Sequence, residues 1–155
     1  ASMNAIAKSY GLPLTLDKHV DYSFPTPTAL ACAGETELRK LKLGFRAKYV
    51  AKAAERVASG EIELEPLRHV EYEEAKRLLM SFPGVGDKVA DCVLLFSLDK
   101  LSSCPIDRWV RRAIEEWYLD GEKLNYKSIR DWCLETWGEY AGYAQQYLFQ
   151  HKRLM

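Results

Sequence analysis

The chain has 155 residues, of which 48% are hydrophobic and 28% charged, and its 22 basic residues are balanced by 22 acidic ones. This is the composition of an ordinary globular domain with a core of its own, and no apolar run approaches the roughly 20 residues that cross a bilayer. We therefore expect an intracellular protein (cytoplasmic or nucleoid-associated, nuclear in a eukaryote) without a membrane partner. A neutral net charge, taken alone, argues against a nucleic-acid-binding protein.

The cysteines argue against a zinc site and against a disulfide framework. No two of them form a Cys-x-x-Cys pair, and the three histidines do not cluster with them. A reduced chain inside the cell fits this pattern. The four cysteines are Cys32, Cys92, Cys104 and Cys133.

Apolar residues at helical spacing predict one all-α domain over residues 1–155 with about nine helices. The three prolines within residues 11–27 predict a loop there, and the glutamates of residues 61–69 predict an acidic connector. The predicted helical ranges are 3–10, 29–32, 35–41, 47–59, 71–80, 87–98, 107–118, 127–137 and 140–152.

The charges are segregated along the chain although they balance overall. Residues 37–56 carry seven basic side chains against two glutamates, whereas residues 61–74 carry six glutamates against one arginine. A basic face with an acidic back still attracts phosphates locally. Lys48, Lys52 and Arg56 form a stripe at i, i+4 and i+8, a spacing that repels by a few tenths of a kcal/mol per pair. The alternative is an ordinary solvated helix face.

Residues 75–80 form an apolar, helix-patterned segment that runs into Pro83-Gly84-Val85-Gly86, and a second helix begins at Asp87, the predicted N-cap. The two glycines allow a very tight reversal of the chain. They also leave backbone N–H groups uncovered beside a helix N-terminus, where an anion such as phosphate binds well.

Lys88 falls in the first turn of this second helix, where the helix dipole opposes a positive charge. The same environment favours the neutral amine, which is a nucleophile. The alternative is a surface lysine that tolerates a cost of about half a kcal/mol. An isolated acid, Asp107, follows about twenty residues later, and its simplest role is an N-cap worth ~1 kcal/mol.

Residues Pro83–Cys92, followed by Pro105-Ile106-Asp107, resemble the helix-hairpin-helix and Gly/Pro-rich loop signature, with its aspartate, of base-excision DNA glycosylases. Lys-Val-Ala-Asp-Cys at 88–92 is similar to the 8-oxoguanine DNA glycosylase/AP lyase branch. The resemblance implies a helical fold and a monomer that acts on double-stranded damaged DNA without a required cofactor. The cysteine quartet of endonuclease III-like relatives is absent, so no iron–sulfur cluster is expected.

The resemblance also implies roles for individual residues. Lys88 is expected to attack the sugar C1′ and form a Schiff base, while Asp107 stabilises the cationic sugar. The alternative for Cys92, a cysteine in the middle of a helix, is core packing. The implied pocket for the flipped base comprises Cys92, Phe96, Gln145 and Phe149.

In the family, the loop at Phe45 and Arg46 supplies an aromatic wedge and an arginine that reads the estranged cytosine. The implied DNA-binding residues are Asn4, Phe45, Arg46, Lys48, Gly84, Val85 and Gly86. The resemblance further implies that the hairpin holds a monovalent cation through the backbone carbonyls of Met80, Phe82 and Val85.

Helical spacing also predicts which side chains face the core. Val89, Val93 and Phe96 are expected to face inward, with Lys88 and Cys92 on another face. Tyr147 and Leu148 are expected to be core residues.

The predicted function is a bifunctional glycosylase/AP lyase that removes 8-oxoguanine by base flipping, Schiff base formation and β-elimination. The alternatives are a glycosylase for another damaged base and a non-catalytic module that grips DNA for a partner.

The chain departs from the family pattern at Trp109, which stands where eukaryotic members have histidine. The helix-hairpin-helix motif spans about 71–98, and the family's N-terminal β domain is not encoded, so we expect a piece of a longer enzyme with residues missing near 4–8.

Overall fold

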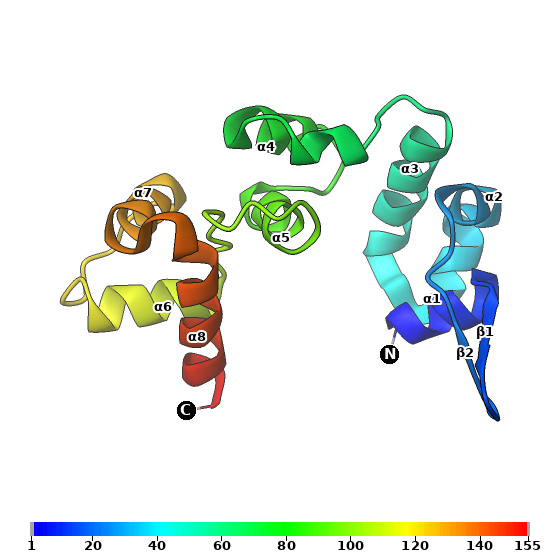
Figure 1. Cartoon of the computed structure of the whole chain (residues 1–155), viewed down its shortest axis with the longest axis horizontal. Helices are drawn as coiled ribbons and strands as arrows, with labels where there is room; N and C mark the ends of the chain where they lie inside the picture. The colour runs from blue at the N-terminus through cyan, green and yellow to red at the C-terminus, as the bar shows by residue number, and fades with distance from the viewer. Residues whose placement is uncertain (1, 155) are drawn as a thin grey trace. The chain divides into compact units, whose positions relative to one another are not determined.

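The computed structural model describes residues 2–154, which divide into two compact units. The first unit contains the chain up to Leu64 together with Phe82–Gly84, and the second contains Glu65–Ser81 and the chain from Val85 onward (Figure 1). No helix in the described part is both long enough and apolar enough to cross a membrane.

The mostly helical fold is confirmed, but residues 2–154 form eight α-helices rather than nine, together with two strands. One helix is lost because residues 29–32 and 35–41 form a single kinked helix that ends at Leu38, with Gly34 at φ 69° in the kink. The elements are α1 (Ser2–Tyr10), β1 (Pro13–Leu16), β2 (His19–Tyr22), α2 (Pro27–Leu38), α3 (Ala47–Ala58), α4 (Tyr72–Met80), α5 (Asp87–Ser97), α6 (Arg108–Trp117), α7 (Tyr126–Trp137) and α8 (Ala141–Leu154).

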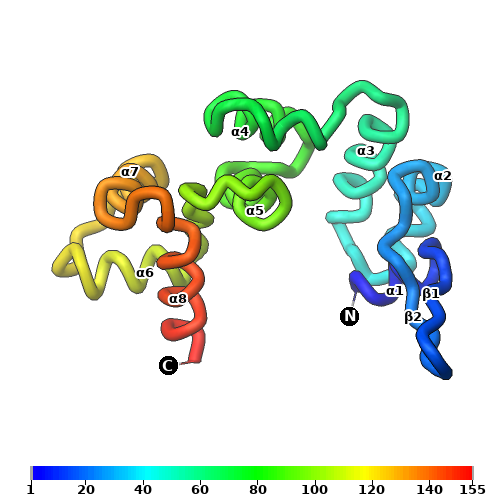
Figure 2. Tube along the Cα trace, viewed as in Figure 1, coloured from blue at the N-terminus to red at the C-terminus, as the bar shows by residue number. Residues whose placement is uncertain are grey.

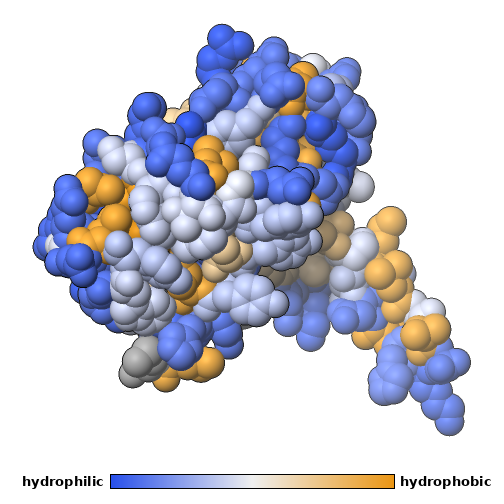
Figure 3. Space-filling view, turned by 60° about the vertical axis from the view of Figure 1, so that its left-hand side comes forward, coloured by the Kyte–Doolittle hydropathy of each residue, from blue (hydrophilic) through white to orange (hydrophobic). Residues whose placement is uncertain are grey.

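The prediction of a loop throughout residues 11–27 is wrong, because β1 and β2 form an antiparallel hairpin there. Leu14 pairs with Asp21, and Asp17 in the turn has a φ of 53°. The prolines do not prevent this, since Pro13 is the first residue of its strand, where a missing N–H is tolerated. The hairpin carries exposed apolar side chains among polar ones (Figure 3).

In the first unit, α2 and α3 pack side by side along most of their length (Figure 2). The face of α3 that enters the core consists of alanines, and such small side chains let two helix backbones approach closely. The buried residues of this core are Ile6, Leu30, Leu38, Leu43, Ala47, Ala51 and Ala54.

The second unit has two apolar clusters. One joins α4 to α5 through Leu67, Ala75, Leu79, Ala90, Leu94 and Leu98. The other joins α6, α7 and α8 to the segment before α6 through Cys104, Ile106, Val110, Ile114, Ile129, Cys133 and Ala141. These two clusters hold α5, which carries Lys88, and α6, which begins directly after Asp107.

Two predictions about inward faces in this unit are wrong. On α5, Val93 packs against the core as expected, but Phe96 is 59% exposed and Val89 is exposed as well. The buried side chains of this helix are Ala90, Asp91, Leu94 and Leu95. The helix is apolar on nearly all sides, so helical spacing does not single out one face. On α8, Leu148 packs against the core as expected, but Tyr147 is 79% exposed.

Candidate functional site

The chain reverses between α4 and α5 at the two glycines of the hairpin, which differ in conformation. Gly84 has a φ of 82°, which favours glycine, while Gly86 is extended, with φ −106° and ψ −176°. Gly86 is therefore the N-cap of α5, and the prediction that Asp87 caps this helix is wrong. The Asp87 carboxylate instead forms an ion pair with Lys76 Nζ at 3.0 Å.

The hairpin presents backbone donors beside the start of α5. Within residues 2–154, no acceptor takes a hydrogen bond from the amides of Gly84, Val85 or Gly86. Uncovered amides beside a helix N-terminus suit an anion in general, and the binding of a phosphate by these residues stays a prediction.

Lys88 is the second residue of α5 and its side chain is exposed. Its ammonium group forms no hydrogen bond or ion pair with any residue of the described range. The Lys88 amine, in the first turn of a helix and without a carboxylate partner in the described range, is therefore open to a ligand.

Asp107 is the N-cap of α6, as the sequence predicts. Its Oδ1 atom accepts from the amides of Trp109 at 2.8 Å and Val110 at 2.9 Å. Its Oδ2 atom has no partner among residues 2–154, and the side chain is half-buried. The cap thus holds the carboxylate in one orientation while leaving one charged oxygen for another group.

The four residues of the expected base pocket all lie on α5 and α8. Cys92 is half-buried and Phe96 exposed, whereas Gln145 is only 3% exposed and accepts from Gln146 Nε2 at 2.6 Å. Phe149 packs against the apolar cluster of α6, α7 and α8.

Gly142 brings these two helices together, a role that helical spacing did not reveal. A Cβ atom at this position would lie 2.4 Å from Leu95 Cδ1, and the Gly142 amide donates to Leu101 O at 2.9 Å. A glycine inside an otherwise helical pattern is the available sequence signal for such a close approach. The first turn of α8 therefore lies against α5, one turn beyond Cys92.

The expected wedge lies in the first unit, before α3. Phe45 is 60% exposed, and the Arg46 guanidinium carbon lies 4.7 Å from the centre of its ring. Tyr49 meets Phe45 edge-on with ring centres 6.3 Å apart, and Lys48 Nζ lies 4.9 Å from the centre of the Tyr49 ring. The loop and the first turn of α3 therefore present two aromatic rings, the exposed Phe45 with Arg46 beside it and the half-buried Tyr49 with Lys48 beside it.

Two further predictions concern the same unit. Asn4 is exposed on α1. Of the predicted basic stripe, Lys48 and Lys52 are exposed, but Arg56 packs over the Phe82 ring at 4.7 Å and pairs with Glu61 at 2.7 Å. Of the three basic residues in the predicted stripe, only Lys48 and Lys52 are therefore exposed to a DNA phosphate backbone.

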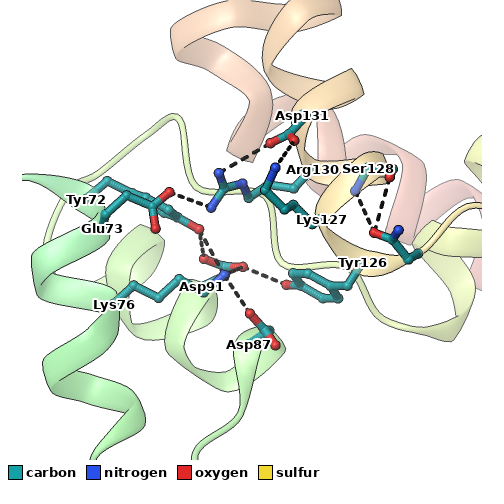
Figure 4. Close-up of polar contacts among 11 residues, drawn as sticks. Tyr72, Glu73, Lys76, Asp87, Asp91, Tyr126, Lys127, Ser128, Arg130 and Asp131 are labelled. Atoms are coloured by element: carbon teal, nitrogen blue, oxygen red, sulfur yellow. Dashed lines mark hydrogen bonds and ion pairs between the residues drawn. The ribbon is translucent and has the colours of Figure 1, made fainter.

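The second unit also contains a buried polar cluster that the sequence analysis missed (Figure 4). Asp91, which is 0% exposed, accepts from Lys76 Nζ at 3.1 Å, from the Tyr126 hydroxyl at 2.6 Å and from the Tyr72 hydroxyl. Lys76 is 6% exposed and also contacts Asp87. Burial, and then hydrogen bonding to Asp91, raises the pKa of both tyrosines, so both hydroxyls stay protonated donors.

The buried ion pair Lys76–Asp91 is sensitive to truncation. Removing one partner of such a pair typically costs about 3–5 kcal/mol, because the other charge stays buried without compensation. The only sequence signal was an aspartate and a lysine within otherwise apolar helix faces. A cavity of about 690 Å³ borders the cluster, and residues from α4, α5 and α7 line it.

No group of three His, Cys, Asp or Glu side chains within residues 2–154 is arranged to hold a metal ion. The monovalent cation predicted from the resemblance would use backbone carbonyls of residues that belong to both units, Phe82 to the first and Met80 and Val85 to the second. That site stays a prediction.

The chain resembles known proteins along nearly all of its length. It is 38% identical over 152 aligned positions to the N-glycosylase/DNA lyase OGG1 of Arabidopsis thaliana, which covers 91% of this chain and 42% of that protein. It is 29% identical to a probable N-glycosylase/DNA lyase of Methanothermobacter thermautotrophicus, over 98% of this chain and 54% of the relative. The chain thus spans about half the length of these relatives.

A solved structure agrees with these matches. The Clostridium acetobutylicum 8-oxoguanine glycosylase/lyase, in complex with double-stranded DNA containing cytosine opposite 8-oxoG, has a TM-score of 0.91 and 37% identity. The match covers 99% of this chain and 52% of that one. The profile of the HhH-GPD superfamily base excision DNA repair proteins matches residues 1–139. The chain therefore belongs to the HhH-GPD superfamily of base excision DNA repair proteins.

Proposed function

We propose that this chain is the helical, catalytic part of a monomeric glycosylase/AP lyase that removes 8-oxoguanine from duplex DNA. The observation that carries the proposal is the exposed Lys88 amine, which has no partner in the described chain and follows a hairpin with uncovered amides. Asp107, with one carboxylate oxygen uncommitted, supplies the negative charge that the reaction needs. The names of the matched relatives support the same reaction.

In the proposed reaction, the hairpin amides bind a backbone phosphate and the damaged nucleotide turns out of the stack. The pocket that receives the base is assigned to Cys92, Phe96, Gln145 and Phe149, while Phe45 fills the gap left in the duplex. Arg46 reads the opposite base and Lys48 contacts a phosphate. Asn4 lies on α1 of the first unit, where we assign it a contact with the DNA.

The chemistry is assigned to two side chains. The neutral Lys88 amine attacks the sugar C1′ as the glycosidic bond breaks, and the bonding pair leaves with the base, which takes up a proton. The ring-opened sugar then carries a Schiff base to Lys88, and β-elimination releases the 3′ phosphate. The Asp107 carboxylate stabilises the positive charge that develops on the sugar.

Borohydride trapping tests the proposal, because it reduces a Schiff base to a stable covalent amine. The 155-residue chain is incubated with duplexes that contain 8-oxoguanine opposite cytosine, an abasic site, another damaged base or no lesion. We expect covalent complexes with the first two duplexes and none with undamaged DNA. Trapping with a different lesion alone would assign the site to another damaged base. Binding of damaged duplex without any trapping would identify a non-catalytic DNA-binding module.

A further inference from the structure

The helix α5 carries a fully buried carboxylate one turn beyond Lys88. Asp91 stands three residues after Lys88 and accepts hydrogen bonds from Lys76, Tyr72 and Tyr126 (Figure 4). Its donors come from α4 and from the first residue of α7. A carboxylate held by several directional bonds restrains the helix that carries it more narrowly than apolar packing does.

Tyr126 connects this carboxylate to the segment that carries Asp107. Its hydroxyl donates to Asp91 at 2.6 Å and accepts from the backbone amide of Ile106 at 3.3 Å. A hydroxyl has one donor and two acceptor positions, so both bonds form together. Ile106 immediately precedes Asp107, and its side chain is buried.

The two residues assigned to the chemistry are therefore tied to one buried group. Lys88 lies on the same helix turn as Asp91, and Asp107 follows a residue whose amide bonds to Tyr126. Asp87 adds a second link between α4 and the start of α5, because its carboxylate also forms an ion pair with Lys76. The distance between a nucleophile and its electrostatic partner must hold to a fraction of an ångström, and a misplacement of about 1 Å can lower a rate roughly 100-fold.

We infer that Asp91 and Tyr126 are positioning residues that hold Lys88 and Asp107 in their working arrangement without touching the substrate themselves. The inference rests on the proposed function, since it assumes the roles assigned to Lys88 and Asp107. A buried ion pair is by itself weak evidence of added stability, so a role in geometry accounts better for the cluster than a role in stability.

The chain offers a matched pair of variants for testing the inference. Tyr72 and Tyr126 are both half-buried, both donate to Asp91, and both rings lie near Lys76 Nζ, at 5.5 and 5.2 Å. Within residues 2–154, Tyr126 is the one whose hydroxyl also bonds the segment before Asp107. Phenylalanine keeps either ring and removes the hydroxyl alone.

Single-turnover base release and borohydride trapping are measured for Tyr126→Phe and Tyr72→Phe. We expect Tyr126→Phe to slow the chemical step by about tenfold or more while the Kd for damaged duplex changes by less than about threefold. Tyr72→Phe should stay within about threefold of the wild-type rate. Equal rates for the two variants, with similar losses of thermal stability, would reduce the cluster to a structural role and overturn the inference.

Amide hydrogen exchange gives a readout that does not depend on activity. In Tyr126→Phe the Ile106 amide should exchange at least about tenfold faster than in wild type, and in Tyr72→Phe it should not. If the wild-type chain fails to trap any lesion, the proposed function fails, but this comparison still decides whether Tyr126 holds the segment before Asp107. Unchanged exchange at Ile106 in Tyr126→Phe would overturn the inference even in an active enzyme.

Discussion

Gly84 lies directly against the ring of Tyr49, so closely that a Cβ atom at position 84 would be 2.6 Å from Tyr49 Cδ2 and Cγ. The hairpin glycine is therefore required for two independent reasons, its positive φ and the aromatic ring beside it. Through Tyr49 it is also connected to the wedge loop, since Tyr49 packs edge-on against Phe45.

We expect Gly84→Ala to lower the free energy of unfolding by about 2 kcal/mol, because a Cβ atom is strained at φ 82° and meets the Tyr49 ring. The control is Gly86→Ala, at a φ of −106° with no atom within 4 Å of the added Cβ. This change should cost less than about 1 kcal/mol. Urea unfolding of both variants measures the difference, and equal losses would contradict this account of Gly84.

Lys88→Gln should abolish base release and covalent trapping while leaving the affinity for damaged duplex within a few-fold of wild type. Lys127→Gln is the matched control, because Lys127 is likewise the second residue of its helix but pairs with Asp131 at 3.2 Å. The control should trap normally. Trapping by Lys88→Gln at wild-type yield would place the nucleophile elsewhere.

Asp107→Asn should slow the single-turnover rate more than ~100-fold, since it removes a preorganised charge beside a developing cation. Asparagine caps helices about as well as aspartate, so the thermal midpoint should change little. Thr26→Ala serves as the reverse control, because it removes the α2 cap that bonds the Ala29 amide at 3.2 Å. We expect that variant to lose stability and keep its rate. If Asp107→Asn loses stability alone, Asp107 is merely a cap.

Arg46→Ala should weaken discrimination between cytosine and adenine opposite the lesion by about 1 kcal/mol or more, because arginine carries paired donors that suit an unpaired cytosine. Lys48→Ala, two residues later in the same exposed region, should weaken all duplexes alike and flatten the salt dependence. Single-turnover rates and affinities for both duplexes distinguish the two. An equal loss on both duplexes in Arg46→Ala would mean that Arg46 contacts phosphate rather than the base.

Features that depend on a few neighbouring residues could be predicted from the sequence. The starts of α5 and α6, the capping role of Asp107 and the reversal at Gly84 all follow from local backbone preferences. The position of Lys88 in a first helical turn follows from the same signals. These preferences act within one helical turn, so distant parts of the chain do not change them.

Other features were decided by the tertiary structure. The nearly uniform apolar surface of α5 did not reveal that Asp91 is buried and Phe96 exposed, and the proline count concealed the β1–β2 hairpin. Tyr126 is 35 residues away from the carboxylate it binds. Whether a charged group is buried depends on the partners that surround it, and those partners come together only when the helices pack. The sequence by itself therefore determined where the candidate nucleophile and its acid stand along the chain, and the packing of α4, α5 and α7 decided which buried polar groups come together around Asp91.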